Sequence, residues 1–203
     1  MDMSLILAFL LSYLLGSLVP GLWVPRLKGI DIREHGSGNP GATNVYRVLG
    51  WKYALPVGIT DFGKGLAAVA LASHLAGPLA WGPILCGLAA VVGHMWPIFG
   101  GFRGGRGVLT AAGALTGLAP LGVLVAVVVW SVVAFSTKYV SLGSISAAVA
   151  FPLSLVVQRE LGVPVSDGLL GLSALVCALI ILRHRPNIQR LLRGEEHRFR
   201  RKK

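Results

Sequence analysis

The stretch GSGNPGATN, residues 36–44, lies between two long apolar runs at residues 4–24 and 54–75. An apolar run of roughly 20 residues is long enough to cross the hydrocarbon core of a bilayer. The stretch between the runs is instead small, polar and rich in glycine, which lets the backbone turn tightly and approach a ligand closely. This pattern predicts a membrane protein with a compact polar loop after its first span.

The composition supports a membrane location. Of the 203 residues, 54% are hydrophobic and only 13% are charged, whereas a soluble domain carries about 25% charged residues. The first apolar run has no basic segment before it and no small-residue cleavage site, so we interpret it as a retained span rather than a signal peptide. The length suits one transmembrane bundle, residues 1–203, with a basic cytoplasmic tail at residues 185–203.

Apolar runs predict an all-α integral membrane protein with seven transmembrane helices, several of them short: residues 4–24, 54–75, 79–99, 108–119, 121–136, 141–157 and 165–182. The fourth and fifth runs meet at Pro120 and by length could form one kinked span. With seven spans and the N-terminus outside, every basic residue except Lys64 and Arg159 lies on the cytoplasmic side. Fusing the two runs would put the basic tail outside, against the cytoplasmic bias of lysine and arginine.

Residues 36–44 predict a phosphate-binding loop. Successive backbone N–H groups in such a turn form an anion-binding nest, and the hydroxyls of Ser37 and Thr43 add donors. Arg47 follows Thr43 by one helical turn. An ordinary hydrophilic loop is the alternative. A dinucleotide site is excluded, because its glycine pattern requires a preceding strand and a βαβ unit.

Three more polar segments fall on the same predicted side of the membrane: residues 99–107, 138–144 and 183–187. Arginine gives planar, bidentate contacts to phosphate, so this convergence predicts a phosphate site at the membrane surface. His94 is interpreted as a packed, hydrogen-bonded histidine, whereas His184 could bind phosphate or act as a base.

Two charged residues lie inside the second apolar run. Asp61 and Lys64 are three residues apart, which favours an ion pair on the helix surface with Lys64 extended toward the membrane surface. The alternative is that Lys64 adds positive potential beside the glycine-rich loop. No Cys-x-x-Cys or His-Glu-x-x-His pattern occurs, so no metal is expected.

Together these segments resemble the bacterial membrane family of acyl-phosphate:glycerol-3-phosphate acyltransferases. The resemblance covers nearly the whole chain and rests on four motifs in the family's order, at residues 36–44, 93–108, 138–145 and 183–188. The family usually has lysine at both basic positions of the second motif, where this chain has Arg103 and Arg106. Arginine keeps the positive charge, but it replaces the compact ammonium of lysine with a planar guanidinium.

The resemblance implies a multi-pass enzyme of the bacterial inner membrane with a cytoplasmic active site. It would transfer the acyl group of acyl phosphate to the 1-hydroxyl of glycerol 3-phosphate, giving lysophosphatidic acid and phosphate for phospholipid synthesis. No cofactor, acyl carrier protein, acyl-CoA or nucleic acid would take part, and the lipid membrane would be its other partner.

The same resemblance implies the site residues. The catalytic group would comprise Ser37, Arg47, Arg106 and His184. Residues Ser37, Asn39, Thr43, Asn44, Arg47 and Arg106 would hold phosphates, and Ser141, Ser144, His184 and Asn187 would hold glycerol 3-phosphate. The whole substrate-binding group would be Gly36, Gly38, Asn39, Thr43, Asn44, Arg103, Gly104, Gly105, Ser141, Ser144 and Asn187.

Acyl phosphate is an activated donor, so positioning and electrostatics could suffice for direct transfer without an acyl-enzyme. The hydroxyl proton would go to a substrate phosphate or to His184. Two other functions remain as alternatives: a membrane transporter for a phosphorylated small anion, and a structural protein whose basic loops bind anionic lipid. A transporter would place its site near the membrane midplane between repeat halves, whereas here every polar cluster lies at one interface.

Overall fold

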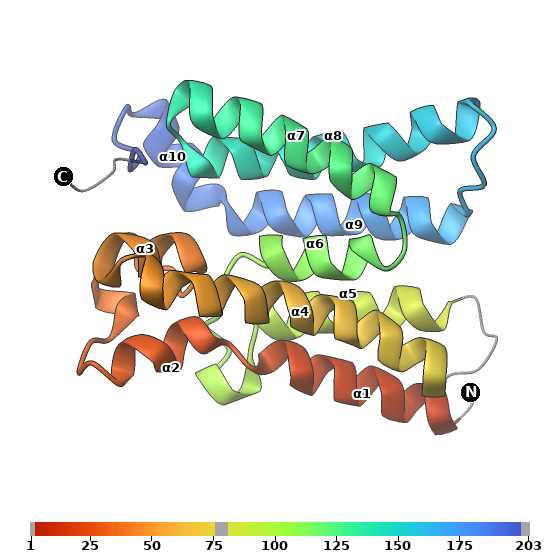
Figure 1. Ribbon diagram of the computed structural model, residues 1–203, viewed down its shortest axis with the longest axis horizontal. Coiled ribbons are helices and arrows are strands. Elements are labelled where there is room, and N and C mark those ends of the chain that lie inside the picture. The colour runs from red at the N-terminus through yellow and green to blue at the C-terminus, as the bar shows by residue number, and fades with distance from the viewer. Residues whose placement is uncertain (1–2, 76–80, 200–203) are drawn as a thin grey trace. The chain divides into compact units, whose positions relative to one another are not determined.

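The computed structural model describes residues 3–75 and 81–199, and the secondary structure in these ranges is helical throughout (Figure 1). The chain divides into two compact units, Met1–Leu118 and Ala119–Lys203. Each unit is described by itself. The prediction of a single bundle over residues 1–203 therefore stays a prediction.

The described part of the N-terminal unit contains these helices: α1 Met3–Ser17, α2 Pro20–Arg26, η1 Ile32–Glu34, α3 Ala42–Leu49, α4 Trp51–Leu75, α5 Gly82–Met95, η2 Ile98–Gly100 and α6 Val108–Thr116. Helices α1, α4, α5 and α6 pack along one another (Figure 1). Small residues make the closest contacts: a Cβ on Gly16 would lie 2.1 Å from the Ala90 carbonyl oxygen, and one on Gly113 would lie 1.9 Å from that of Phe62. Such backbone approach is how helices associate in lipid, where apolar surface gives no driving force.

A separate apolar cluster supports the polar loop of this unit. Val19, Leu22, Ile32, Val45 and Val57 are buried together, so α2, η1, α3 and the start of α4 share one small core. Because these residues flank the 36–44 stretch on both sides, the loop is anchored at each end by apolar burial.

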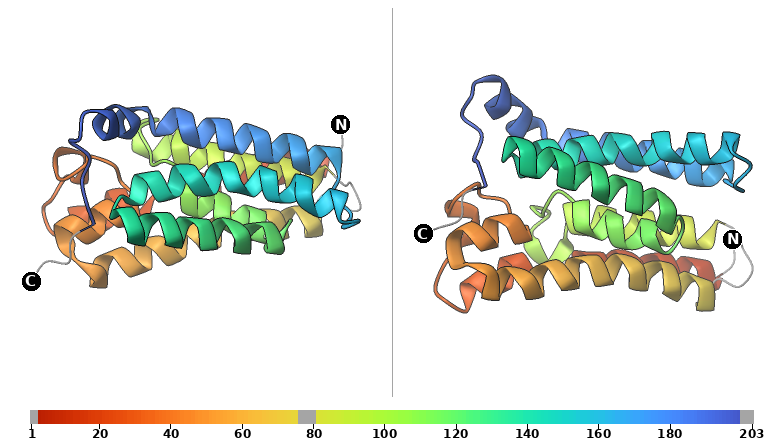
Figure 2. Two further views of the ribbon diagram at one scale, coloured as in Figure 1. Left: turned by 90° about the horizontal axis from the view of Figure 1, so that it is seen from above. Right: turned by 45° about the horizontal axis from the view of Figure 1, so that its top comes forward.

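The C-terminal unit contains α7 Pro120–Thr137, α8 Val140–Glu160, α9 Asp167–Arg183 and α10 Arg185–Leu192. Helix α8 packs against both α7 and α9. Pro186 is at the second position of α10, where its missing N–H costs nothing, and α10 bends from α9 by 57° (dark blue in Figure 2). His184 lies at the corner, between the end of α9 and the start of α10.

Among the described residues, five helical segments are long and apolar enough to cross a membrane: Met3–Arg26, Trp51–Leu75, Gly82–Gly100, Pro120–Thr137 and Val140–Glu160. Counting the bent pair α9 and α10 as one span gives up to six. Helix α6 has nine residues, about 14 Å at 1.5 Å per residue, which is well short of a bilayer core of about 30 Å. Helices α6 and α7 are two elements that meet at Pro120, while the prediction of two spans here, and of seven in all, stays a prediction.

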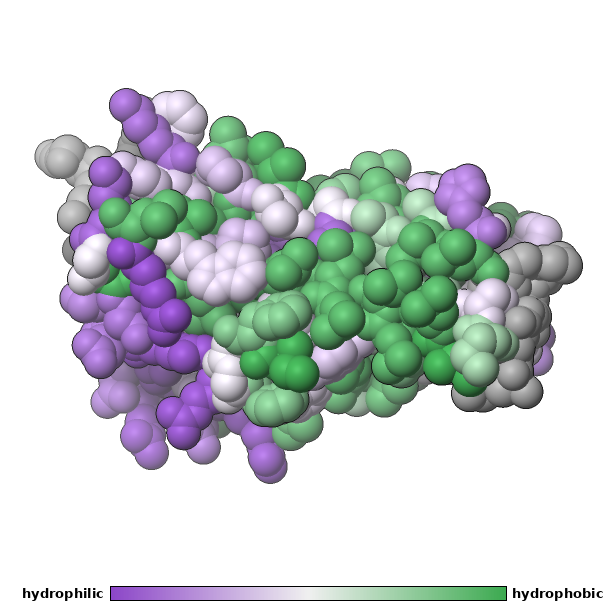
Figure 3. All heavy atoms as spheres, turned by 90° about the horizontal axis from the view of Figure 1, so that it is seen from below, coloured by the Kyte–Doolittle hydropathy of each residue, from purple (hydrophilic) through white to green (hydrophobic). Residues whose placement is uncertain are grey.

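Hydrophilic residues are not spread evenly over the surface. On the face seen from below in Figure 3, they gather mainly at the left end, where α2 and α3 lie in Figure 1, and apolar residues cover the middle. This distribution is the one expected of a protein that spans a bilayer and exposes polar loops at an interface.

The orientation can be tested with single cysteines at three exposed leucines. In a protein with Cys86 and Cys177 replaced by alanine, we expect a membrane-impermeant maleimide to label Leu161→Cys in intact cells. It should label Leu27→Cys and Leu192→Cys only after the membrane is opened. All three side chains are more than 75% exposed, so access depends on the side of the membrane. Labelling of position 27 or 192 from outside contradicts the predicted orientation.

Candidate active site

The polar loop of the N-terminal unit is folded around the side chain of Asn44. This side chain is buried; its Oδ1 accepts from the Ser37 N–H at 2.8 Å, and its Nδ2 donates to the His35 carbonyl at 2.9 Å. Gly36 has φ +62°, and a Cβ there would lie 2.3 Å from Asn44 Oδ1. Glycine is therefore required at position 36 both by its left-handed backbone and by the space that Asn44 occupies.

Ser37 lies between two glycines with positive φ, Gly36 and Gly38. Its Oγ is buried and has no hydrogen-bond partner among the residues that the structure describes. A buried hydroxyl without a partner costs free energy unless a ligand or water satisfies it. The loop therefore offers a donor at the position where the nest of backbone N–H groups was predicted.

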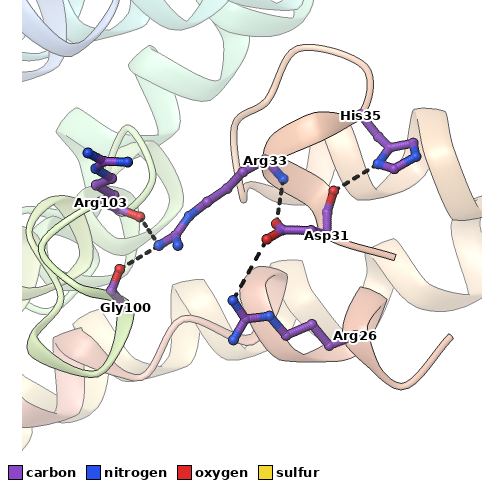
Figure 4. Close-up of polar contacts among 6 residues, drawn as sticks. All are labelled: Arg26, Asp31, Arg33, His35, Gly100 and Arg103. Atoms are coloured by element: carbon purple, nitrogen blue, oxygen red, sulfur yellow. Dashed lines mark hydrogen bonds and ion pairs between the residues drawn. The ribbon is translucent and has the colours of Figure 1, made fainter. Parts of the chain in front are cut away.

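Arg33 joins the two glycine-rich loops of this unit (Figure 4). Its Nη2 donates to the carbonyl oxygens of Gly100 and Arg103, at 2.5 and 2.6 Å. Its backbone N–H donates to the Asp31 carboxylate at 3.0 Å, and Asp31 also pairs with Arg26 at 3.9 Å. Residues 31–35 and 98–106 are thus held together by one guanidinium.

The sequence does not reveal this role of Arg33, because no motif distinguishes a guanidinium that binds carbonyls from one that binds phosphate. The two predicted arginines of the second motif also differ in their surroundings. The Arg103 side chain is exposed and points away from Arg33 in Figure 4, whereas Arg106 is half-buried.

The segment before Arg106 is pressed against His94. Gly104 and Gly105 donate their N–H groups to the carbonyls of Met95 and His94, at 3.2 and 3.1 Å. A Cβ on Gly105 would lie 2.1 Å from His94 Nε2. Because a side chain at position 105 would displace the histidine ring, this glycine pair fixes the path of the backbone that leads into Arg106.

His94 in turn belongs to a buried network of charges. The Lys64 ammonium lies 2.8 Å from Asp61 Oδ1 and 2.8 Å from His94 Nδ1, and it donates to the Leu18 carbonyl at 2.7 Å. The same His94 Nδ1 also lies 3.3 Å from Asp61 Oδ1, so this nitrogen faces both members of the ion pair. The interpretation of His94 as a packed, hydrogen-bonded histidine is confirmed.

The expected surface position of Lys64 was wrong. Asp61 and Lys64 do form the predicted ion pair, but both side chains are only 2% exposed. A spacing of three residues predicts that the two side chains meet. It does not predict whether the helix face that carries them points toward lipid or toward other helices. Here that face is turned toward α1 and α5, where Leu18 and His94 supply partners.

Removing the cation from this network tests its contribution to stability. We expect Lys64→Met to lower the free energy of unfolding by about 3–5 kcal/mol, because the Asp61 carboxylate stays buried without its partner. Denaturant titration in detergent micelles measures the change, with Lys52→Met, an exposed cation of the same helix, as the control.

The double variant Asp61→Asn/Lys64→Met should be less destabilised than Lys64→Met alone, since no unpaired charge is left in it. A single variant as stable as the Lys52→Met control would show that the network contributes little.

In the C-terminal unit, predicted substrate-binding residues gather around Glu196. Ser141 Oγ and Asn187 Nδ2 donate to its Oε1 at 2.8 and 2.7 Å, and Arg190 Nε donates to its Oε2 at 2.8 Å. Burial alone would raise the pKa of the Glu196 carboxyl, but the hydrogen bonds from Asn187, Arg190 and Ser141 outweigh burial and hold that pKa below its ordinary value. The carboxylate is therefore ionised at neutral pH.

The sequence does not mark Glu196 as a buried carboxylate. Its neighbour Glu195 is exposed, whereas Glu196 is buried, and nothing in the local sequence separates them. Phe199 also donates its N–H to the Lys138 carbonyl at 2.7 Å, and Arg198 stacks on the Tyr139 ring at 5.5 Å. The basic tail therefore packs on the start of α8 within this unit.

His184 and Ser144 are also buried in the C-terminal unit. His184 Nδ1 lies 2.8 Å from the Ile180 carbonyl, which can only accept, so Nδ1 carries a proton. Ser144 Oγ donates to the Val140 carbonyl at 3.0 Å and accepts from Trp130 Nε1 at 3.3 Å. In the neutral imidazole, the basic nitrogen of His184 is Nε2.

The predicted site residues thus fall into two groups, each described within its own unit. The N-terminal group holds Gly36, Ser37, Gly38, Asn39, Thr43, Asn44, Arg47, Arg103, Gly104, Gly105 and Arg106, and the C-terminal group holds Ser141, Ser144, His184 and Asn187. Within residues 3–75 and 81–199, no three His, Cys, Asp or Glu side chains are placed to hold a metal ion. The contact of either group with a substrate stays a prediction.

Comparison with known proteins identifies the family of the chain. The sequence profile of the glycerol-3-phosphate acyltransferases matches residues 6–194. The chain belongs to this family. The glycerol-3-phosphate acyltransferase of Salinibacter ruber is 44% identical, with 95% of this chain and 91% of the relative covered. That of Aquifex aeolicus is also 44% identical, with 97% and 100% covered.

Two solved structures of the family are similar along almost the whole chain. Both are crystal structures of PlsY, an integral membrane glycerol 3-phosphate acyltransferase. The glycerol 3-phosphate form has a TM-score of 0.89 at 44% identity and covers 97% of this chain and 96% of that one. The lysophosphatidic acid form has a TM-score of 0.86 at 43% identity, with 96% and 95% covered. The protein described here, as a member of the same family, is therefore an integral, multi-pass membrane protein.

Proposed function

We propose that the protein transfers the acyl group of acyl phosphate to the 1-hydroxyl of glycerol 3-phosphate and releases lysophosphatidic acid and phosphate. The observation that carries the proposal is the loop around Ser37, whose buried hydroxyl has no partner among the described residues. The chain that carries this loop belongs to a family in which the crystal structures of PlsY are a glycerol 3-phosphate form and a lysophosphatidic acid form.

The N-terminal group suits the binding of phosphate. We assign Ser37, Arg47 and Arg106 to direct contact, because a hydroxyl, backbone N–H groups and guanidinium forks together surround a tetrahedral anion. Both amide atoms of Asn44 are used by the loop backbone, so its role here is to shape the loop. Gly105 and His94 hold the backbone that presents Arg106.

The C-terminal group suits the acceptor, glycerol 3-phosphate. Asn187 donates its Nδ2 to Glu196, and its Oδ1 is buried without a partner among the described residues. An amide oxygen in this state accepts a hydrogen bond from a hydroxyl. We therefore assign Asn187 to a glycerol hydroxyl, with Ser141, Ser144 and His184 beside it, and Glu196 to orienting Asn187 and Ser141.

The chemistry requires little covalent participation from the protein. The 1-hydroxyl oxygen attacks the acyl carbon, the bond from that carbon to the phosphate oxygen breaks, and phosphate leaves with the electron pair. Arg47 and Arg106 neutralise the charge that develops on the phosphate, which is catalysis by positioning and electrostatics. We assign the hydroxyl proton to a substrate phosphate oxygen, since a phosphate with a second pKa of about 6 is a competent base near neutrality.

We place this site at the cytoplasmic face of the bacterial inner membrane, in a seven-span protein with its N-terminus outside. Support comes from the basic residues, which fall almost entirely on one side in that arrangement. Acyl phosphate would reach the site from the membrane and glycerol 3-phosphate from the cytoplasm, so an interfacial position serves both substrates.

Purified protein in detergent, supplied with labelled glycerol 3-phosphate, tests the reaction. We expect lysophosphatidic acid with acyl phosphate and none with acyl-CoA or acyl carrier protein. Arg106→Ala should lose roughly 10–100-fold in rate, the cost of one charge-assisted contact, and Arg106→Lys should keep substantial activity because it keeps the charge. Arg193→Ala, an exposed arginine, is the control.

Three outcomes would contradict this assignment. Product from acyl-CoA but not from acyl phosphate would overturn the donor. A near-normal rate in Arg106→Ala would remove Arg106 from the site. Uptake of glycerol 3-phosphate into proteoliposomes without product would favour the transporter.

Direct transfer is tested by incubating the protein with acyl phosphate alone and measuring its intact mass after denaturation. We expect no acyl adduct, because the donor already carries a good leaving group and a covalent intermediate would gain little. A protein acylated on an added surface cysteine provides the positive control for detection. A stoichiometric adduct on Ser37, Ser141 or Ser144 would refute the mechanism.

A further inference from the structure

The two glycine-rich loops of the N-terminal unit share one side chain, that of Arg33 (Figure 4). Its Nη2 donates to the carbonyl oxygens of Gly100 and Arg103. Between these two residues the backbone turns at Gly101 and Phe102, and both have a left-handed conformation, with φ of +63° and +59°. Glycine adopts this conformation without a steric cost, but a phenylalanine rarely does. The turn therefore depends on contacts with the surrounding structure.

The backbone that carries Arg33 is held by the first loop. The Ile32 carbonyl accepts from Asn44 Nδ2 at 3.4 Å. The Arg33 N–H donates to the Asp31 carboxylate at 3.0 Å. A Cβ on Gly38 would lie 2.9 Å from the Arg33 carbonyl oxygen, so the first loop passes directly over this residue. The guanidinium thus reaches the second loop from a backbone position that the first loop sets.

The guanidinium binds one end of the peptide group between Arg103 and Gly104. The oxygen of this group accepts from Arg33 at 2.6 Å, and its N–H donates to the Met95 carbonyl at 3.2 Å. A planar peptide group that is bound at both ends has a fixed orientation. Only Gly105 separates it from Arg106. The direction in which Arg106 leaves the loop therefore depends on the contact made by Arg33.

We propose that Arg33 is a positioning residue that assembles the site for the donor phosphate from the two loops. The inference rests on the proposed function, in which Ser37 of the first loop and Arg106 of the second contact phosphate. Arg33 lies four residues before Ser37. It binds the carbonyl of Arg103, which lies three residues before Arg106. One side chain therefore sets how far apart the two phosphate-binding groups are.

A direct contact between Arg33 and the phosphate is the alternative. Two carbonyls already take the two N–H groups of Arg33 Nη2, which favours the positioning role. A guanidinium has three further N–H groups, on Nε and Nη1. A loss of activity on replacing Arg33 therefore does not separate the two roles. A measurement of the loop structure does, because a phosphate contact leaves the second loop unchanged in the absence of substrate.

The chain offers two arginine–glycine bonds for this measurement, Arg103–Gly104 and Arg193–Gly194. Both arginine side chains are exposed, so trypsin can bind either one. Cleavage also requires the protease to bind the carbonyl of the arginine, and Arg33 holds that of Arg103. In the purified protein in detergent, we expect Arg193–Gly194 to be cut at least about tenfold faster than Arg103–Gly104. Intact masses of the fragments report both rates.

Replacing Arg33 tests whether its contact sets the loop and the reaction together. We expect Arg33→Met to speed cleavage of Arg103–Gly104 about tenfold or more and to leave that of Arg193–Gly194 within about twofold. The variant should lower kcat/KM for acyl phosphate about tenfold or more, because a misplaced contact costs on this order. The KM for glycerol 3-phosphate should stay within about twofold, since its groups lie in the other unit. Arg33→Lys should recover most of both properties, because an ammonium keeps the charge and three donors.

Arg26→Met is the matched control. Arg26 pairs with Asp31 of the same segment, whereas Arg33 binds the carbonyls of the second loop. The control should keep both cleavage rates and kcat/KM within about twofold. Reduced activity in Arg33→Met without faster cleavage at Arg103–Gly104 would indicate a direct phosphate contact and would overturn the proposal. Faster cleavage with normal activity, or equal effects of the two variants, would also overturn it.

An Arg33→Met protein that is cut rapidly and equally at both bonds has unfolded. The two rates in the wild-type protein then decide, and equal rates would overturn the proposal. The proposed function fails separately: a wild-type protein that makes no lysophosphatidic acid from any donor contradicts that function, while the cleavage rates still report the contact of Arg33. A wild-type protein that makes product but is cut equally at both bonds contradicts the role of Arg33 alone.

Discussion

The ammonium of Lys64 is the contact on which the N-terminal unit depends most. A charge inside a membrane span must find its partners within the protein, because lipid offers none. Lys64 finds them on three segments: Asp61 on its own helix, His94 at the end of α5 and the Leu18 carbonyl after α1. One cation thus fixes three segments, and the His94 ring that it holds fixes the backbone at Gly105.

The need of buried polar groups for partners within the protein also shapes both polar groups of the candidate site. In the N-terminal unit, Arg33 satisfies the carbonyls of the second loop and Asn44 satisfies the backbone of the first. In the C-terminal unit, Glu196 collects donors from Ser141, Asn187 and Arg190. Residues that only position others thus lie next to those assigned to substrates. This division is expected where catalysis relies on preorganised donors rather than on a covalent step.

The sequence alone determined the helical membrane class and the family, because apolar runs and ordered motifs are local signals. The tertiary structure decided which charges are buried. The spacing of Asp61 and Lys64 predicted their pairing but not their burial, and Glu196 could not be told from Glu195. The role of Arg33 could likewise not be predicted from the sequence. Each of these depends on partners 30 to 70 residues away in the chain, and such contacts arise only when the helices pack.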